Sequence, residues 1–384
     1  MPNRKDLTKQ TIRFYFRHAW RYPKHVIGLA ISIPCTVLAN NIIPPIILAN
    51  VLNRLSRHDF QSHRVWASFG PELSMYAAIV ILAGVTGWRI VDALDWRLEG
   101  NVERDIAREV FDHLQQQSAT FHANHFGGSM VSQTNKLMGS YIRFADTTVF
   151  NVLPLLFSLL FICIILGHIA VWYALIILAF AVLYIVSSFY VTRPVRRLGA
   201  EQAARESAQT GVLADAITNV MAIKSFSGSA YENKRFAKAT DHTRAGLLSM
   251  LRYNQRQQAY FSTIVNVISA SALLMAVVGV VVFGANIATV FLLLTYTASV
   301  ANQLFQFSNS ALRTYNRALG DASDMIGILG ITPEIADPKD PETSRISRGL
   351  IDFDHVTFQH DGADDALFDD LSVRIKPGEK VGLV

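Results

Sequence analysis

Long apolar stretches alternate with long charged stretches along most of the 384-residue chain. A helix crosses a bilayer with about 20 mostly apolar residues, and six stretches come close to or exceed that length. They are Val26–Leu52, Leu73–Val91, Val149–His168, Ala170–Val191, Phe261–Phe283 and Ile287–Phe307. The pattern predicts an all-α membrane domain of six long transmembrane helices. Composition agrees, because only 17% of the residues are charged, against about 25% in ordinary soluble domains.

The charged segments that follow the second and the fourth span are long and have helical periodicity. In the first of them, the apolar residues Ile106, Val110 and Leu114 fall on one helical face. We therefore expect spans two to five to continue as helices beyond the membrane. They would form two helical hairpins that reverse at short tips, for which Phe121–Gly128 and Asn219–Phe226 are the candidates.

The distribution of lysine and arginine predicts the orientation of the chain. Basic residues crowd residues 1–25 and the segment between the fourth and fifth spans, whereas the turns at 167–168 and 284–286 have none. Because cytoplasmic loops carry the excess of Lys and Arg, we expect both termini in the cytoplasm and the protein in the plasma membrane. The net charge of +5 then reflects topology. No basic patch laced with aromatic residues accompanies it, so we expect no nucleic-acid partner.

Residues 349–384 change character and predict β-structure. The stretches Ile351–Phe358 and Leu371–Lys376 alternate apolar and polar residues, as half-buried strands do. A third, apolar strand is expected to begin at Lys380 and to continue to Val384. A strand of that kind often leads into a glycine-rich loop whose backbone N–H groups bind phosphate. That loop is not in the sequence, so the chain holds the approach to an ATP site without the site.

Taken together, these segments resemble an ABC exporter half-transporter. The motifs that carry the resemblance are two inner loops, Phe121–Asn135 and Glu206–Phe226, and the start of a nucleotide-binding domain, Gly349–Phe358 and Leu367–Val384. The resemblance covers almost the whole chain. It implies a basic arm (1–25), a six-helix transmembrane domain (26–320), a linker (321–348) and a truncated, β-rich part of an α/β nucleotide-binding domain (349–384).

The resemblance also implies a function, which is that of a subunit of an ATP-driven exporter. The full-length protein would bind ATP and Mg²⁺, sit in membrane lipid, pair with a second half-transporter and move an unidentified substrate. The phosphate loop, the signature loop, the magnesium-binding Asp and the catalytic Glu would all follow Val384, so no residue here is assigned a catalytic role. Two alternatives remain, an ion-coupled secondary transporter and a truncated, non-catalytic membrane protein that only dimerises.

The hairpin tips resemble coupling helices, which dock onto the ATP-binding domains of the family. The alternative is that they are ordinary helical turns. Apolar side chains at a cytoplasmic tip need a partner that covers them, which favours coupling. The residues expected to take part are Phe121, Asn124, Phe126, Asn219, Lys224 and Phe226.

His360 occupies the position at which the family has an aromatic residue, usually Tyr, that stacks on adenine. An imidazole ring can also stack, although more weakly than a phenol ring. The alternative is a surface histidine in a turn.

The sixth span has a stripe of uncharged polar residues at helical spacing. Such residues are costly in lipid and face the interior of a helix bundle. They would line the substrate cavity or, alternatively, hold helices together by hydrogen bonds. The candidates are Thr295, Ser299, Asn302, Gln303 and Gln306.

Arg89, Asp92 and Asp95 lie three residues apart at the inner end of the second span. Residues at this spacing share one helical face, so Arg89 and Asp92 can form an ion pair. A role in binding substrate or protons is the alternative. His122 and His125 are also three apart but have no further ligands nearby in the sequence, so we expect no metal site.

Overall fold

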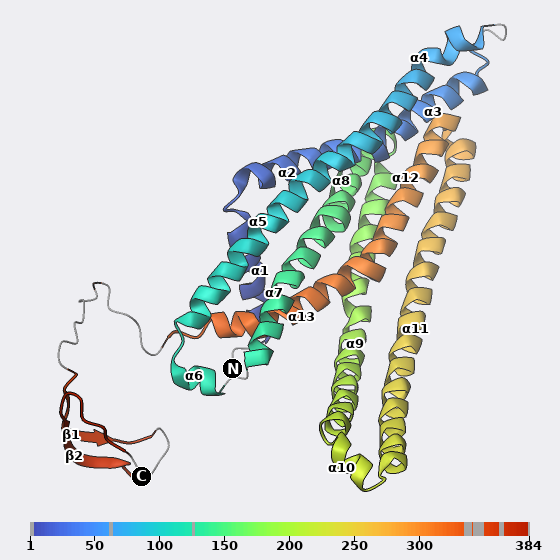
Figure 1. Cartoon of the computed structure of the whole chain (residues 1–384). Coiled ribbons are helices and arrows are strands. Elements are labelled where there is room, and N and C mark those ends of the chain that lie inside the picture. The colour runs from blue at the N-terminus through green and yellow to red at the C-terminus, as the bar shows by residue number, and fades with distance from the viewer. Residues whose placement is uncertain are drawn as a thin grey trace. The chain divides into compact units, whose positions relative to one another are not determined.

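A computed structural model of the chain contains two compact units, residues 1–333 and 334–384. The first unit is helical and the second is a β-hairpin (Figure 1), which confirms the predicted fold class. The first unit contains six helical rods that are long and apolar enough to cross a membrane. The structure describes residues 4–60, 64–124, 127–333, 340, 349–360 and 365–382.

Four of the six rods are α-helices joined through short π-helical segments, and the fourth and fifth rods are uninterrupted. The first three rods are α2 (Pro23–Val37), η1 (Leu38–Ile42) and α3 (Ile43–Ser56); α4 (Val65–Ala78), η2 (Ile79–Gly87) and α5 (Trp88–Gln115); and α7 (Gly127–Thr147), η3 (Thr148–Val152) and α8 (Leu153–Ile169). The last three are α9 (Val171–Thr218); α11 (Ser229–Phe283); and α12 (Ile287–Gln306), η4 (Phe307–Ala311) and α13 (Leu312–Leu329).

The π-helical segment in the first rod has a local cause. Pro44 and Pro45 have no N–H to donate, so the carbonyl groups of Asn40 and Asn41 lose their α-helical donors. The helix widens over Leu38–Ile42, where these carbonyls lie. The Asn40 side chain then donates from Nδ2 to the Ala83 carbonyl oxygen at 3.2 Å, which joins the first rod to the second.

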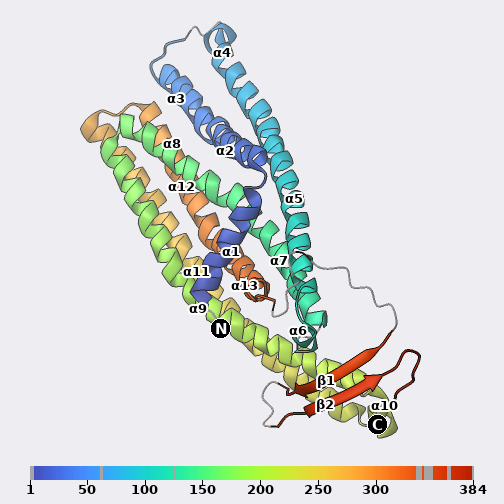
Figure 2. The ribbon, with the colours of Figure 1, turned by 90° about the vertical axis from the view of Figure 1, so that its left-hand side faces the viewer.

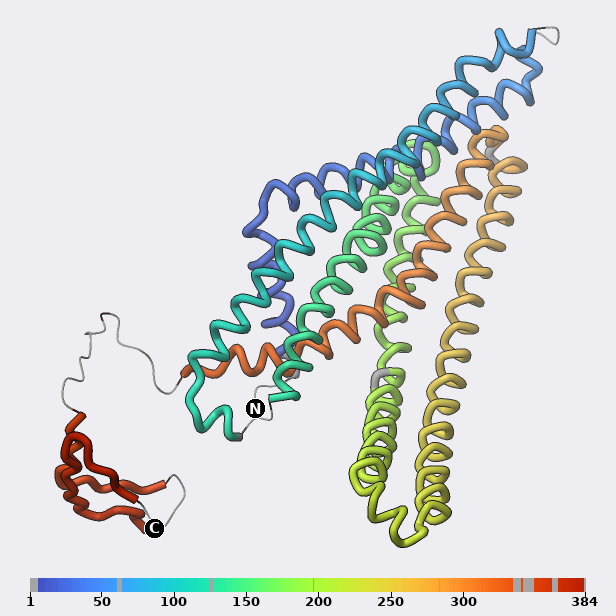
Figure 3. Tube along the Cα trace, in the orientation of Figure 1, coloured from blue at the N-terminus to red at the C-terminus, as the bar shows by residue number. Residues whose placement is uncertain are grey.

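Both predicted helical hairpins are present (Figures 2 and 3). Helix α5 is connected to α7 through α6 (Ala119–Asn124), and α9 is connected to α11 through α10 (Val220–Ser225). The N-terminal helix α1 (Arg4–Ala19) and helix α13 pack with α5 and α7 around one apolar cluster. Helices α9 and α11 pack along each other, and their membrane parts join α8 and α12 in a second cluster. Helix α13 continues to Leu329, through the first part of the predicted linker 321–348.

The β-hairpin consists of β1 (Ile351–Phe358) and β2 (Phe368–Ile375), which are antiparallel with Ile351 opposite Ile375. Two expectations were wrong. Lys380–Gly382 form no strand, because a strand needs a pairing partner and the described β-strands pair only with each other; Leu383 and Val384 lie outside the described residues. The strands are also exposed on both faces rather than half-buried, since among the described residues no second layer covers them.

Candidate functional site: the hairpin ends, the polar helix face and the buried charges

The first hairpin ends at α6, whose aromatic side chain is already covered by its own chain. Phe121 is only 9% exposed and packs into the cluster formed by α5 and α7. Its backbone N–H is held by Ser118 Oγ at 3.2 Å. The expectation that Phe121 requires an outside partner to cover it was therefore wrong. Asn124 ends α6, and Phe126 lies outside the described residues.

The second hairpin end is built differently. Phe226 and Met221 are 86% and 76% exposed at α10. Asn219 precedes the helix and donates from Nδ2 to the Asp215 carbonyl oxygen at 2.9 Å, while Lys224 is exposed to solvent. The reversal into α11 is tight, because Ser227 adopts a positive φ of 50°. This end therefore presents a tight reversal with exposed apolar side chains.

The polar residues of α12 divide into two sets. One set is buried and holds helices together: the Tyr296 hydroxyl donates to the Ile42 carbonyl oxygen at 2.9 Å, and Thr297 Oγ1 lies 2.6 Å from the Tyr173 hydroxyl. The sequence analysis named neither Tyr296 nor Thr297 as a candidate. Helical spacing alone does not show which of two neighbouring polar faces of a helix is buried.

The predicted stripe forms the other set and makes no hydrogen bond to another helix among the described residues. Asn302 and Gln306 are exposed, and Thr295 is half-buried. Among the described hydrogen bonds, these five side chains make one with each other, from Gln303 Nε2 to Ser299 Oγ at 3.1 Å. The face is therefore free to meet a ligand or another helix.

His360 follows β1 and is exposed. Its ring meets the ring of Phe358 edge-on, with centroids 4.9 Å apart. The imidazole face is thus not stacked on this neighbour, and stacking on adenine stays a prediction.

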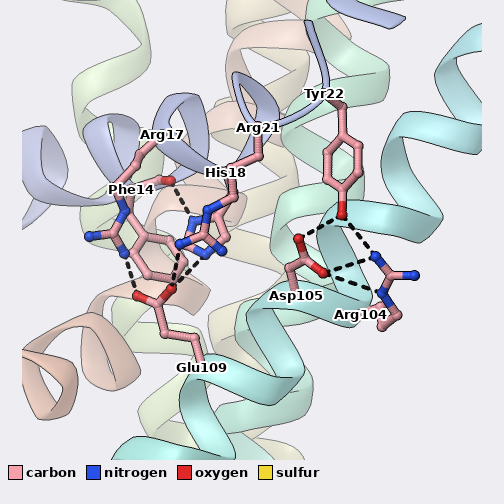
Figure 4. A network of polar contacts seen from close by, with 8 residues as sticks. All are labelled: Phe14, Arg17, His18, Arg21, Tyr22, Arg104, Asp105 and Glu109. Carbon is pink, nitrogen blue, oxygen red and sulfur yellow. Dashed lines mark hydrogen bonds and ion pairs between the residues drawn. The ribbon is translucent and has the colours of Figure 1, made fainter. Parts of the chain in front are cut away.

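One carboxylate on α5 binds three basic side chains, two from α1 and one from the turn that follows it (Figure 4). Glu109 Oε2 lies 2.9 Å from His18 Nε2 and accepts a hydrogen bond from Arg21 Nη2 at 3.2 Å, while Glu109 Oε1 pairs with Arg17. His18 is fully buried, and its Nδ1 lies 2.9 Å from the Phe14 carbonyl oxygen. Desolvation acts to raise the pKa of Glu109, but the charges of His18, Arg17 and Arg21 and the hydrogen bond with His18 together outweigh it, so this pKa is lowered. Glu109 lies well beyond Val91, the end of the second apolar stretch.

A second polar contact lies beside it in the same view. The Tyr22 hydroxyl donates to Asp105 Oδ2 at 2.7 Å and accepts from Arg104 Nη2 at 2.8 Å. The hydrogen bond from Tyr22 is the main reason that the pKa of Asp105 is lowered. The sequence analysis used the basic residues of α1 only as a topology signal. Their spacing of one helical turn was the feature that could have indicated a shared acidic partner.

Acidic residues gather where α5 meets α7. Arg89 Nη1 and Asp92 Oδ2 are 3.3 Å apart, which confirms the predicted ion pair. Asp95 does not join that pair. It is buried beside Glu99 and Asp146, which the sequence analysis missed because both lie in a segment read as cytoplasmic.

The fold and these ends define a multi-pass membrane protein with two helical hairpins that extend beyond the apolar spans. The sequence matches the family model of the ABC transporter transmembrane region over residues 29–304. The chain therefore belongs to this family, which favours the ATP-driven reading over an ion-coupled secondary transporter.

Several curated relatives are similar at low identity. ABC transporter B family member 6 of Dictyostelium discoideum is 23% identical over 90% of this chain and 52% of the relative. The heavy metal tolerance protein of Schizosaccharomyces pombe is 26% identical over 73% of this chain and 34% of the relative. The mitochondrial iron-sulfur clusters transporter atm1 of Neurospora crassa is 23% identical over 73% of this chain and 39% of the relative. The chain thus spans about half or less of these relatives.

A solved structure of a bacterial Atm1-family ABC exporter with ATP bound has the same fold. The TM-score is 0.74 at 18% sequence identity, and the match covers 92% of this chain and 61% of that one.

Proposed function

We propose that the chain is the membrane-spanning part of a subunit of an ATP-driven exporter. The observation that carries the proposal is the second hairpin, in which α9 and α11 lead to α10 with Phe226 and Met221 uncovered. Neighbouring exposed apolar side chains at the end of a helical hairpin mark an interaction surface. If the chain works as an ABC exporter subunit, the partner at this surface is an ATP-binding domain. The β-hairpin with His360 would be the first part of that domain.

The proposed cycle uses two copies of the membrane part. ATP and Mg²⁺ would bind between paired ATP-binding domains, and their closure would push on α10. Because α9 and α11 are continuous helices from α10 into the spans, a push at α10 moves the membrane ends of both. The higher affinity of ATP for the closed state supplies the free energy that shifts the equilibrium. A second half-transporter and membrane lipid are the partners that this cycle requires.

We place the substrate path along the stripe of α12, where Asn302 and Gln306 are exposed in the single chain. Relatives are named for heavy metal tolerance and for iron-sulfur clusters, so their names suggest no single cargo for this chain. The basic N-terminal arm and the basic segment between the fourth and fifth spans support cytoplasmic termini. We propose the plasma membrane as the location.

The test is a truncation of the exposed aromatic at α10. Phe226→Ala in the full-length protein, reconstituted in lipid, should leave ATP hydrolysis measurable but reduce ATP-driven movement of the spans severalfold, since anchor aromatics contribute about 2 kcal/mol or more to an interface. The movement is measured without a known cargo, as the change in distance between spin labels attached at Ala285→Cys in the two copies, in a background with Cys35→Ala and Cys163→Ala.

Leu251→Ala is the matched control, because Leu251 is also exposed (48%) on α11 but lies away from α10. It should behave as the unaltered protein does. An unchanged ATP-driven distance change in Phe226→Ala would overturn the role of α10. Absence of ATP-dependent movement in the unaltered full-length protein would overturn the proposed function.

A further inference from the structure

Three carboxylates converge between α5 and α7, just beyond the apolar parts of the second and third spans. Asp95 and Glu99 are four residues apart on one face of α5, and Asp146 lies in the last turn of α7. One oxygen from each group lies within 4.8 Å of the others. Asp95 is fully buried and Glu99 is 8% exposed. We call these three residues the acidic triad.

Three buried oxygens of the triad lack hydrogen-bond partners among the described residues. Among the described residues, neither carboxylate oxygen of Asp95 nor Oε1 of Glu99 has a hydrogen-bond partner. A buried carboxylate without hydrogen bonds or a counter-charge is strongly unfavourable. A fold that places two such carboxylates beside the half-buried Asp146 therefore calls for a positively charged or protonating partner.

The basic side chains nearby are already engaged. Arg89 pairs with Asp92 at 3.3 Å, and Arg143 pairs with Asp321 at 2.7 Å. None of the ion pairs among the described residues includes a member of the triad. The charged groups that act on Asp95 and Glu99 are other acids, namely Asp92, Asp146 and Glu103. The Tyr141 hydroxyl on α7 also lies in the field of Asp95 and Glu99 and adds no positive charge.

An apolar cavity of about 190 Å³ adjoins the triad. Asp95 is its acidic lining residue, and Tyr15, Leu98, Phe144 and Val149 are among the others. These walls supply few polar groups that could solvate a carboxylate. The surroundings thus leave the negative charge of the triad to be balanced by a bound species.

We propose that Asp95, Glu99 and Asp146 bind one divalent cation of the class that prefers oxygen ligands, which comprises Mg²⁺, Mn²⁺ and Ca²⁺. These ions bind carboxylate oxygens at about 2.0–2.6 Å, so oxygens that share one ion can lie up to about 5 Å apart. The spacing of the triad fits that limit. The absence of sulfur and imidazole from the triad disfavours softer ions. Water fills the remaining coordination positions.

The ion joins two helices that belong to the same hairpin. Glu99 and Asp95 come from α5, which leads to α6, and Asp146 comes from α7, which returns from it. A bound cation cross-links them between the spans and the hairpin end, and it cancels two of the three negative charges. The site does not depend on ATP or on the proposed export function.

The experiment uses the 384-residue chain in lipid nanodiscs, stripped with EDTA and free of nucleotide, at pH 7. Mn²⁺ is the probe, and free Mn²⁺ is measured by electron paramagnetic resonance. We expect one Mn²⁺ per chain, displaced by Mg²⁺ or Ca²⁺. Asp95→Asn and Glu99→Gln should each weaken binding by about tenfold or more, since each removes a charged ligand.

Asp92→Asn is the matched control. It removes the same charge one helical turn away from Asp95, but Asp92 pairs with Arg89 and lies outside the triad. The affinity of the Asp92→Asn chain for Mn²⁺ should differ from that of the unaltered chain by less than about threefold, because the lost charge is not on a ligand.

A stability measurement separates lost binding from misfolding. In EDTA, both triad variants should unfold at the same temperature as the unaltered chain or higher, because each relieves repulsion between like charges. Mn²⁺ should raise the unfolding temperature of the unaltered chain and not that of the variants. Equal Mn²⁺ binding by the unaltered chain and by an Asp95→Asn, Glu99→Gln double variant would overturn the proposal. If the unaltered chain did not bind Mn²⁺ at pH 7, the proposal would also be overturned. Protonation of the carboxyl groups would then be what neutralises the triad.

Discussion

Glu109 shows how one side chain positions a whole helix. It contacts Arg17 and His18 in the last turn of α1 and Arg21 directly after the helix. His18 is fully buried, so loss of Glu109 leaves a buried imidazole nitrogen without its acceptor. A buried polar group that loses its partner costs about 1–3 kcal/mol. We expect Glu109→Ala, which removes this acceptor, to loosen α1 by about this amount, measured as faster amide hydrogen exchange in Arg4–Ala19.

The same carboxylate predicts a pH dependence. Because the folded-state pKa of Glu109 is lowered, its stabilising contribution is present above the ordinary carboxyl pKa of about 4.3 and is lost as the pH falls through the folded value. Exchange in α1 should therefore speed up as the pH drops below about 5 in the unaltered protein, beyond the intrinsic effect of pH on exchange. The acceleration should be smaller in Glu109→Gln and unchanged in Asp241→Asn, an exposed acid. If exchange in α1 accelerated equally at low pH in all three proteins, Glu109 would not be the cause of the pH dependence.

Residue-level prediction from sequence worked for contacts within a helix turn. The Arg89–Asp92 pair follows from a spacing of three. It failed for Phe121, whose burial depends on how α6 folds back against α5 and α7. Glu99 and Asp146 are 47 positions apart in the printed sequence, and only the pairing of α5 with α7 brings them together.

At the scale of elements, the close approach of the first two rods depends on a glycine. A Cβ added at Gly87 would lie 2.9 Å from Thr36 Oγ1 and 3.0 Å from Thr36 Cγ2. Thr36 is buried, and as a β-branched residue in a helix it has few alternative rotamers. The first rod must therefore shift to accept any larger residue at this position.

We expect Gly87→Ala to destabilise the chain by about 1–3 kcal/mol, as overpacked sites do, seen as a lower unfolding temperature in detergent. Gly100→Ala is the control, since no atom lies within 4 Å of its added Cβ. Alanine there should be neutral or stabilising because it favours the helix. A larger loss for Gly100→Ala than for Gly87→Ala would refute the packing argument.

The hairpin elements follow the predicted pattern closely. The candidate tips Phe121–Gly128 and Asn219–Phe226 overlap the short helices α6 and α10. Periodicity over long helices is a strong local signal. The strand expected from Lys380 failed because pairing, rather than apolar alternation, decides whether a strand forms.

At the scale of the whole molecule, orientation follows from the proposal of cytoplasmic termini. The turn between α11 and α12 should then face outward, and α10 should face the cytoplasm. In a background with Cys35→Ala and Cys163→Ala, a membrane-impermeant maleimide applied to intact cells should label Ala285→Cys and not Ser227→Cys. After the cells are opened, both positions should react. If only Ser227→Cys were labelled in intact cells, the orientation would be opposite to the proposed one.

The sequence alone determined the six membrane spans, the two helical hairpins and the β-rich C-terminal segment. Hydropathy, periodicity and charge depend on neighbouring residues, so they can be read from the sequence. The family membership rests on the match of residues 29–304 to the family model. Tertiary structure decided which polar and charged groups meet. It buried Phe121 while leaving Phe226 exposed, and it split the polar residues of α12 into a packing face and a free face. It also gathered Asp95, Glu99 and Asp146, since burial and contact depend on the packing of helices that are distant in the chain.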